Sequence, residues 1–245
     1  MIIIDCKQHS EEWHQVRLGI PTASMFHLLV KPKDKKPSAS RAGYAKTLIA
    51  ERLLGVALES VSTGFMDRGA ELEESAVAYY DLDRGLTTTE VGFVLTDDRL
   101  AGCSPDRLVG DTGGLEIKCL SPAVHISNMI SVNPFYLLQV QGCMWITQRE
   151  WWDLLFFHPD IQSFIVHIPR DIDTVVALSE AVDALYATMR EAMLSIRKQH
   201  GVEEHVWYPP SEFQAPLLLD KCEEPGTVGG EATAPGPVPA WEAYR

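Results

Sequence analysis

The sequence predicts an α/β fold of the α+β type, in which a mixed central β-sheet is flanked by helices. The first observation is that apolar residues recur at helical spacing in several segments, most clearly over residues 175–196. The second is that short apolar segments lie between turn residues, as at 115–120 and 163–168. Helices and strands are therefore both expected to contribute to the core.

The N-terminal part is expected to hold one short strand followed by helices. The strand covers residues 2–4, and the helices cover residues 10–19, 22–30, 43–54 and 68–80. Gly19 ends the first helix, and Thr22 is expected to cap the N-terminus of the second. A basic loop with two prolines, residues 31–41, follows that second helix.

Strands dominate the part that follows, with two more helices. The strands cover residues 87–97, 100–111, 115–120, 151–158 and 163–168, and the helices cover residues 133–148 and 175–196. The DTGG sequence at 111–114 is typical of a hairpin turn and is expected to join the second strand to the third.

The chain divides into one expected folded domain, residues 1–200, and an acidic extension rich in Pro and Gly, residues 201–245. Of all residues, 46% are apolar, which is enough for a substantial core. The extension carries eight acidic side chains against two basic ones. Because such a composition buries little apolar surface, we expect the extension to be partly disordered.

Composition argues against several classes of protein. Five scattered cysteines favour reduced thiols over a disulfide framework or a zinc site. The N-terminal apolar run is too short for a signal peptide, and no apolar stretch reaches membrane-spanning length. We therefore expect a soluble cytoplasmic protein with no membrane partner. The net charge of −13 argues weakly against a nucleic-acid coat protein but permits a local basic channel.

The most informative segment is CSPDRLVGDTGGLEIKC, residues 103–119. Because strand residues alternate between faces, Glu116 and Lys118 should point the same way, about 6.6 Å apart along the strand. The turn folds the preceding strand back, so that Asp106 can reach the same end of the sheet. Two carboxylates, the carbonyl of Ile117 and one ammonium group would then surround one point.

This set of groups suits phosphodiester hydrolysis. Hard oxygen ligands bind Mg²⁺, for which Mn²⁺ can substitute, and usually leave several waters on the ion. The ion polarises the phosphate and lowers the pKa of a bound water. Lys118 can orient that water or neutralise charge on the phosphate as the reaction proceeds.

The spacing of these residues alone is a weak pattern, which also fits a surface hairpin with an incidental Glu–Lys pair. Four features favour the nuclease interpretation. Pro105 precedes Asp106, both strands carry apolar residues, the turn is tight, and a helix with glutamines follows shortly after.

The pattern Pro105, Asp106, Glu116 and Lys118 resembles the PD…ExK motif of nucleases with a restriction-endonuclease-like core. Four longer segments resemble the lambda-exonuclease family of phage recombination nucleases in order and approximate spacing. They are RLGIPTAS at 17–24, RGAELEESA at 68–76, GCSPDRL at 102–108 and LLQVQGCMWIT at 137–147.

The resemblance implies a metal-dependent 5′→3′ exonuclease. Such an enzyme degrades one strand of linear double-stranded DNA from a 5′-phosphorylated end and leaves a 3′ single-stranded tail for recombination by strand annealing. It implies two Mg²⁺ ions per site, a homotrimer that threads DNA ends, and a single-strand annealing protein as partner. It also implies a phage-encoded or bacterial protein of the cytoplasm.

The resemblance assigns roles to individual residues. Asp106, Glu116 and the carbonyl of Ile117 match the metal ligands, and Lys118 matches the catalytic lysine. Glu73 matches a helix glutamate that adds a carboxylate near the metals; without the resemblance it would be read as a solvated acid.

Gln139 matches the active-site glutamine of the family. Gln141 is the alternative candidate for this role. Residues two apart on a helix do not share a face, so only one of the two glutamines should reach the site.

Arg17, Ser24 and Ser104 match a pocket for the 5′-phosphate. Ser24 falls in the first turn of its expected helix, where free N–H groups favour phosphate. Arg17 could clamp a phosphate with two hydrogen bonds, or it could form an ordinary salt bridge. Such a pocket explains directionality, because each cut leaves a new terminal phosphate that can dock in it.

Two further sets of residues correspond to the family less closely. The family separates the last base pairs with an apolar wedge, and Phe65 or Met66 lies in roughly the corresponding place. Within the basic loop, Lys33, Lys35 and Lys36 are expected either to line a DNA channel or to be solvated.

Two other functions stay open. A structure-specific or restriction-type endonuclease on the same fold would cut closed circular DNA and would need no 5′-phosphate pocket. The other is a recombination scaffold that binds DNA without catalysis. A site that had lost its activity should also have lost at least one of its residues, yet all four are present: Asp106, Glu116, Lys118 and Gln139.

Overall fold

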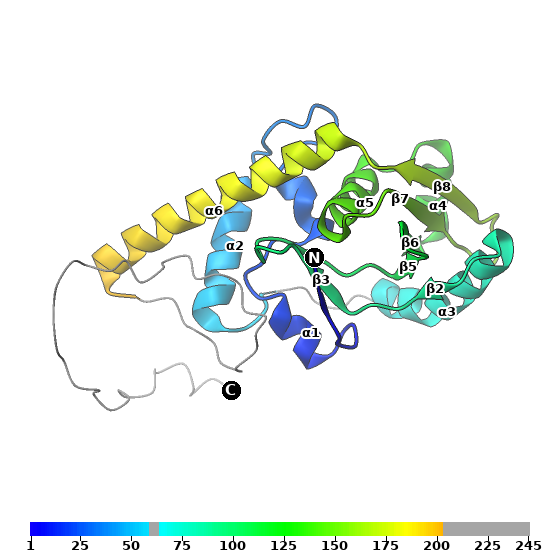
Figure 1. Ribbon diagram of the computed structural model, residues 1–245, viewed down its shortest axis with the longest axis horizontal. Helices are drawn as coiled ribbons and strands as arrows, with labels where there is room; N and C mark the ends of the chain where they lie inside the picture. The colour runs from blue at the N-terminus through cyan, green and yellow to red at the C-terminus, as the bar shows by residue number, and fades with distance from the viewer. Residues whose placement is uncertain (59–63, 203–245) are drawn as a thin grey trace.

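The computed structural model describes residues 1–58 and 64–202, which form two β-sheets with helices packed around them (Figure 1). The larger sheet has the strand order β2-β5-β6-β7-β8 and the smaller has the order β1-β3-β4. The strands are β1 (Ile2–Ile4), β2 (Thr88–Thr89), β3 (Phe93–Leu95), β4 (Gly102–Cys103), β5 (Arg107–Val109), β6 (Gly113–Lys118), β7 (Trp151–Phe156) and β8 (Phe164–Pro169).

The helices agree with the predicted segments, apart from one that was not predicted, α4. They are α1 (Glu11–Val16), the 3₁₀ helix η1 (Ala23–Leu28), α2 (Arg41–Leu54), α3 (Gly64–Arg84), α4 (Pro122–Ile130), α5 (Pro134–Thr147) and α6 (Ile172–His200). The missed helix begins with Pro122 directly after Ser121, and proline is well suited to the first helical position.

The five-stranded sheet is mixed, as predicted. β6 and β7 run parallel, and the other neighbouring strands are antiparallel. One face packs against α3, where Tyr80 joins Leu115 and Ile117 of β6 in a buried cluster. Trp152 and Leu154 of β7 belong to the main core on the opposite face, the side of α5. The alternation of β6 therefore turns Leu115 and Ile117 toward α3, and the residues between them toward α5.

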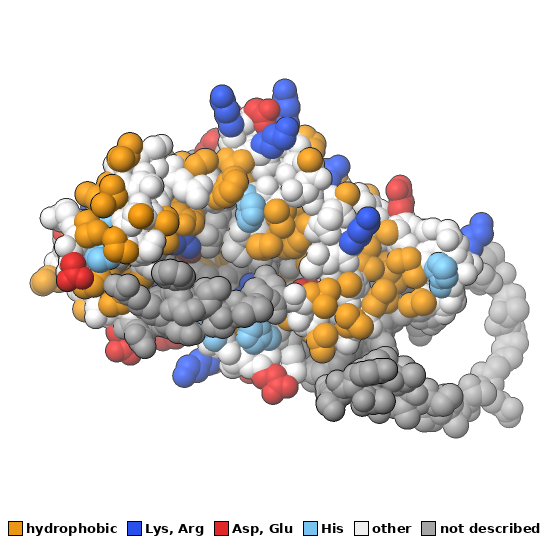
Figure 2. All heavy atoms as spheres, turned by 180° about the vertical axis from the view of Figure 1, so that it is seen from behind, with side chains coloured by type: hydrophobic (Ala, Val, Ile, Leu, Met, Phe, Trp, Pro, Cys, Tyr) orange, Lys and Arg blue, Asp and Glu red, His pale blue; other side chains and the backbone are white. Residues whose placement is uncertain are grey.

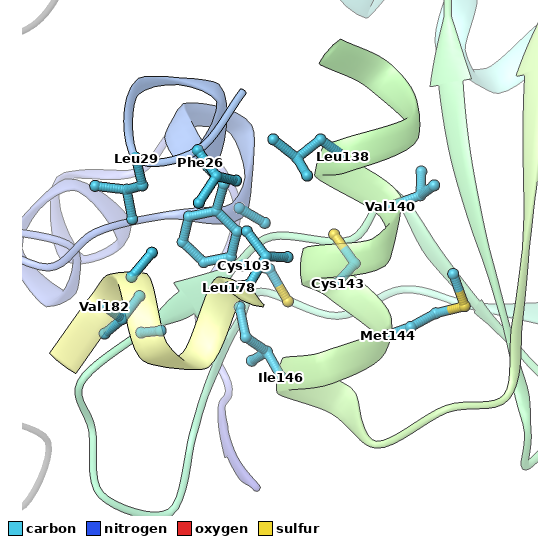
Figure 3. Close-up of a cluster of buried hydrophobic side chains, with 14 of the residues drawn as sticks. Phe26, Leu29, Cys103, Leu138, Val140, Cys143, Met144, Ile146, Leu178 and Val182 are labelled. Atoms are coloured by element: carbon cyan, nitrogen blue, oxygen red, sulfur yellow. The ribbon is translucent and has the colours of Figure 1, made fainter. Parts of the chain in front are cut away.

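The main core joins η1, α5 and α6 (Figure 3). Phe26 of η1 lies against α5, and Leu178 and Val182 of α6 close the cluster from another side. Gly142 permits this close packing, because a Cβ added there would lie 2.5 Å from the ring of Phe26. The segment that carries Ser24 is thereby fixed beside the helix that carries the predicted active-site glutamine.

Two predicted strands are each divided between the two sheets. The segment 87–97 supplies β2 and β3, and the segment 100–111 supplies β4 and β5. Residues 104–106 are the link by which the chain leaves the smaller sheet and enters the larger one. The two segments pair with each other in both sheets, β3 with β4 and β2 with β5, so an apolar pattern along either segment does not show where one strand ends and the next begins.

The hairpin turn lies earlier than predicted, at residues 110–112, and Gly113 and Gly114 begin β6. The rings of Trp151 and Trp152 in the neighbouring strand cover these glycines, so that a Cβ on either one would clash with an indole. The glycines are therefore required by packing between strands and not by the turn.

The helix predicted over residues 22–30 is the 3₁₀ helix η1, and Thr22 occupies its N-cap position, as predicted, in an extended conformation. The Thr22 side chain makes no capping hydrogen bond to a main-chain N–H. Its hydroxyl lies 3.2 Å from that of Ser24 instead. Because η1 is short and wound as a 3₁₀ helix, the expected helix-terminus attraction for phosphate at Ser24 loses its basis.

α6 ends at His200, next to the predicted domain boundary, with Gly201 in the left-handed conformation at its C-terminus. Residues 203–245 lie outside the described part, so the division into domain and extension stays a prediction. Within the described ranges, the helices are too short or too polar to cross a membrane.

The packing at Gly142 gives a stability test with an internal control. Gly142→Ala should destabilise the protein by about 1–3 kcal/mol, because the methyl group overpacks the contact with Phe26. Gly43→Ala in α2 meets no atom within 4 Å and should stabilise by about 0.4–1 kcal/mol. Urea unfolding midpoints measure both changes, and an equal effect of the two substitutions would contradict this packing.

Candidate active site

Three of the predicted catalytic residues form one hydrogen-bonded group on the α5 side of β6. The ammonium of Lys118 and the amide of Gln139 both donate to Oε1 of Glu116, each at 2.6 Å. The Lys118 ammonium also lies 3.4 Å from the Gln139 Oε1. Glu116 and Lys118 thus share a face, as the strand alternation predicted.

Asp106 joins this group from the link between the two sheets. Its Oδ2 accepts a hydrogen bond of 2.5 Å from the main-chain N–H of Ile117. Burial, and next the Glu116 carboxylate, raise the pKa of Asp106 well above its usual value, although Lys118 opposes this effect. Two carboxylates that repel each other therefore lie at one end of β6.

Burial and the neighbouring carboxylates shift the pKa of Lys118 in opposite directions. Burial by itself lowers this pKa, but Glu116 and Asp106 outweigh burial, and the pKa of Lys118 is raised. The ammonium form is therefore the stable form at neutral pH, and its positive charge offsets one of the two carboxylates.

The carboxylates have the chemistry that a hard cation requires. Oε2 of Glu116 is buried without a hydrogen-bond partner, and the repulsion between Glu116 and Asp106 would be relieved by a positive ion. Among the side chains that the structure describes, those of residues 1–58 and 72–202, no three from His, Cys, Asp or Glu group together as a metal site. The donor set fits Mg²⁺, which is commonly held by one or two carboxylates and retains waters.

Glu73 lies apart from the hydrogen-bonded group. Its Oε1 is 3.8 Å from the Arg107 guanidinium, which also lies 3.7 Å from Glu90. α3 approaches the sheet from the face opposite to α5, yet Glu73 contributes to the raised pKa of Asp106. A metal-binding role for Glu73 stays a prediction, because Arg107 is its partner in this structure.

The two glutamines of α5 separate as their spacing predicted. Gln139 reaches Glu116, whereas Gln141 bridges the junction between β8 and α6. The Gln141 amide donates to the carbonyl of Pro169 at 2.8 Å, and its oxygen accepts from the N–H of Asp171 at 2.9 Å.

Arg149 supports the hairpin, and the sequence analysis missed it. One nitrogen of its buried guanidinium donates to the carbonyls of Val109, Gly110 and Gly113, at 3.2, 2.8 and 2.5 Å. These carbonyls flank the turn between β5 and β6, so Arg149 fixes the two strands that hold the carboxylates.

Gln8 supports the link to Asp106 and was also missed. Its amide nitrogen donates to the carbonyl of Val91 at 2.9 Å and to that of Pro105 at 2.8 Å. Pro105 directly precedes Asp106. No local sequence signal marks Gln8 or Arg149, because each acts on carbonyls far away in the chain.

Two of the three predicted 5′-phosphate residues are joined through Trp13. The Arg17 guanidinium lies 3.6 Å from the centroid of the Trp13 ring. The Trp13 indole N–H donates to the hydroxyl of Ser104 at 2.8 Å. Ser24 is exposed on η1, hydrogen-bonded to Thr22. Arg17 also lines a cavity of about 300 Å³ between α1, η1 and α2.

The predicted DNA-contacting lysines differ in their surroundings. Lys35 forms an ion pair of 2.9 Å with Asp171 at the start of α6. Lys33 and Lys36 are exposed, the latter 3.9 Å from Asp34. Lysine and arginine side chains gather at the top of the molecule in Figure 2, over the region of this loop in Figure 1. The side chains of Phe65 and Met66 lie outside the described part, so the wedge stays a prediction.

Comparison with known proteins agrees with this fold. A family model, the YqaJ-like viral recombinase domain, matches residues 12–150. The crystal structure of an alkaline exonuclease, LHK-Exo from Laribacter hongkongensis, is 33% identical with a TM-score of 0.71. That match covers 78% of this chain and 98% of the exonuclease, and the complex of LHK-Exo with dAMP matches equally.

A phage-related exonuclease from Haemophilus somnus 129PT is 16% identical, with a TM-score of 0.60. That match covers 72% of this chain and 96% of the other, and at this identity it shows the fold alone. No curated protein sequence matches the chain.

The fold and the carboxylate–lysine hairpin define a protein of the lambda-exonuclease-like PD-(D/E)xK class. The chain belongs to the YqaJ-like viral recombinase family.

The contrasting environments of two aspartates predict stability changes of opposite sign in metal-free protein. The folded-state pKa of Asp106 is raised, so its ionisation at neutral pH destabilises the fold, and Asp106→Asn should stabilise by about 0.5–2 kcal/mol. Hydrogen bonds from Lys35, and then Thr174, lower the pKa of Asp171 to about 2, so Asp171→Asn should destabilise.

Urea unfolding with a chelator at pH 7 measures both substitutions. The Asp171 contribution is complete above pH 4 and should disappear as the pH falls to about 2. A loss of stability in Asp106→Asn equal to that in Asp171→Asn would show that repulsion does not dominate at Asp106.

Proposed function

We propose that this chain is a metal-dependent exonuclease that degrades one strand of linear double-stranded DNA from a 5′-phosphorylated end. The remaining strand becomes a 3′ single-stranded tail, which recombination by strand annealing can use. The observation that carries the proposal is the hydrogen-bonded group of Glu116, Lys118 and Gln139 beside Asp106. The likeness to an alkaline exonuclease supports it.

Asp106 and Glu116 would hold the metal, with the carbonyl of Ile117 and the carboxylate of Glu73 as further oxygen ligands. Mg²⁺, for which Mn²⁺ would substitute, is the expected ion, with two ions per site. When bound, it polarises the scissile phosphate and lowers the pKa of a bound water.

The protein's own groups stabilise and orient the reacting phosphate. Lys118 keeps its proton because Glu116 and Asp106 raise its pKa, so it presents a fixed positive charge to the developing charge on the phosphate oxygens. Gln139 holds both Glu116 and Lys118, which limits their rotamers. Such fixed groups need little reorganisation during the reaction.

The end of the strand would be recognised through its terminal phosphate. Arg17 can give a charge-assisted hydrogen bond, and its stacking on Trp13 couples its position to that of Ser104. Ser24 would complete the pocket from η1. Re-docking of each new 5′-phosphate would place the next bond at the carboxylates.

Three broader expectations accompany this function. We propose a homotrimer that threads the duplex end, a single-strand annealing protein as partner, and a location in the bacterial cytoplasm. The recombinase role that the family name states supports the second of these, and the first and third rest on the resemblance to the lambda-exonuclease family.

The direct test compares linear duplexes with a 5′-phosphate or a 5′-hydroxyl in the presence of Mg²⁺. The phosphorylated strand should be degraded from its 5′ end, about tenfold or more faster than the hydroxyl strand, because charge-assisted hydrogen bonds are lost. Lys118→Ala should lower the rate by about 100-fold or more. Lys46→Ala, an exposed lysine of α2, is the matched control.

Closed circular DNA separates the alternatives. Cleavage of closed circles would favour the endonuclease, and wild-type protein that binds DNA without any hydrolysis would favour the silent scaffold. Equal rates on phosphate and hydroxyl ends would remove the roles proposed for Arg17, Ser24 and Ser104 while leaving the metal site intact.

The basic loop gives a separate prediction about DNA affinity. If the loop lines the DNA path, Lys33→Ala and Lys36→Ala should each reduce the slope of log affinity against log salt by about 1. Lys35→Ala should change it less, because Asp171 already neutralises that charge. Binding is measured in a Lys118→Ala background, so that the DNA stays intact. Unchanged slopes would mean that the loop is simply solvated.

A further inference from the structure

Phe135 is an exposed aromatic residue whose ring is held in one position. The residue is 47% exposed at the start of α5, and its ring stacks on His27 of η1. The two centroids are 4.8 Å apart and the planes are inclined by 26°. His27 is fixed in turn, because its Nδ1 donates to the carbonyl of Ser24 at 3.1 Å. One face of Phe135 is therefore covered, and the ring is ordered although it is exposed.

This stacked pair lies between the two halves of the proposed active site. Phe135 and Gln139 are four residues apart on α5, so they share a face about 6 Å apart along the axis. The neighbouring Tyr136 ring lies 5.0 Å from the Lys118 ammonium. On the other side, His27 is bonded to Ser24, a residue of the proposed phosphate pocket.

The chain segments that form the pair and its surface carry no formal charge. The sequence between Lys118 and Arg149 contains no Asp, Glu, Lys or Arg, and neither does η1. In a chain with a net charge of −13, such a surface beside the active site suits an uncharged flat group better than a phosphate. A nucleobase is such a group, and any base can stack on an aromatic ring.

We propose that the Phe135–His27 pair is a stacking platform for the unpaired base at the 5′ end of the strand being degraded. The proposal rests on the exonuclease function and assigns it a nucleobase site. A base taken out of the duplex loses its stacking on its neighbour, and the ring of Phe135 replaces part of that contact. Since every base has a flat face, the platform tolerates all four bases, as an enzyme that digests any sequence requires.

The test is a thermodynamic cycle between the ring and the base. Binding to a duplex with a normal 5′-terminal nucleotide is compared with binding to one whose 5′-terminal nucleotide is abasic but phosphorylated, both in the Lys118→Ala background. The protein with Phe135 should bind the normal end roughly 5- to 100-fold more tightly. Phe135→Ala should remove most of this preference, and Phe135→Trp should restore it.

Two controls make the result decisive. Leu82→Ala, an 87% exposed apolar residue of α3, should leave the preference unchanged. Hydrolysis by otherwise wild-type protein tests the underlying function separately, so a failure of the exonuclease proposal is recognised by the absence of strand degradation. The proposed platform is contradicted if strand degradation is normal and Phe135→Ala leaves the preference for the normal end unchanged. This would be seen if the substitution weakened binding to the normal and abasic ends equally, or weakened binding to neither.

Discussion

The buried carboxylate of Glu116 is the constraint on which the arrangement of the site depends. The residue is 3% exposed, and a carboxylate so far from water is tolerated only with partners that replace its hydration. Lys118 supplies one from the same strand, and Gln139 supplies the other from α5. α5 must therefore pack on this face of β6. The close contact at Gly142 then fixes η1, so the carboxylate and the proposed phosphate pocket are held by one continuous packing unit.

Asp106 lies beside the second carboxylate of the proposed site, at the expense of the metal-free fold. Lys118 offsets one buried carboxylate, and the raised pKa of Asp106 shows that the second is not fully offset. A bound cation would remove this repulsion, so part of the energy that destabilises the metal-free protein becomes affinity for the ion. The hairpin tolerates the repulsion because Arg149 fixes its turn and Gln8 fixes the link before Asp106.

Sequence reasoning succeeded where the relevant geometry is local. The alternation of one strand placed Glu116 beside Lys118, and the spacing on one helix separated Gln139 from Gln141. It failed where distant segments decide. The division of the predicted strand 87–97 between two sheets depends in part on β1, which pairs with β3 from the N-terminus of the chain.

The assignment of Gly113 and Gly114 to a turn failed for the same reason, because tryptophans of β7 require them within a strand. Gln8 and Arg149 carry no local signal, because each binds carbonyls about 35 or more residues away in the chain. The resemblance to a nuclease family predicted the family of the chain, but not the residues that support the proposed site.

The acidity of the chain is compatible with a DNA substrate once charge is considered by location. The path proposed for the strand passes Arg17, the uncharged aromatic surface at Phe135, and Lys118. Much of the negative charge of the chain is carried by other segments. A phosphate would be repelled by the acidic segments and attracted by the positive charges of Arg17 and Lys118 along this path. A strand end that follows the proposed path would bind in one orientation. Affinity and directionality would have the same origin, because the groups that attract the terminal phosphate also decide which bond lies beside Glu116.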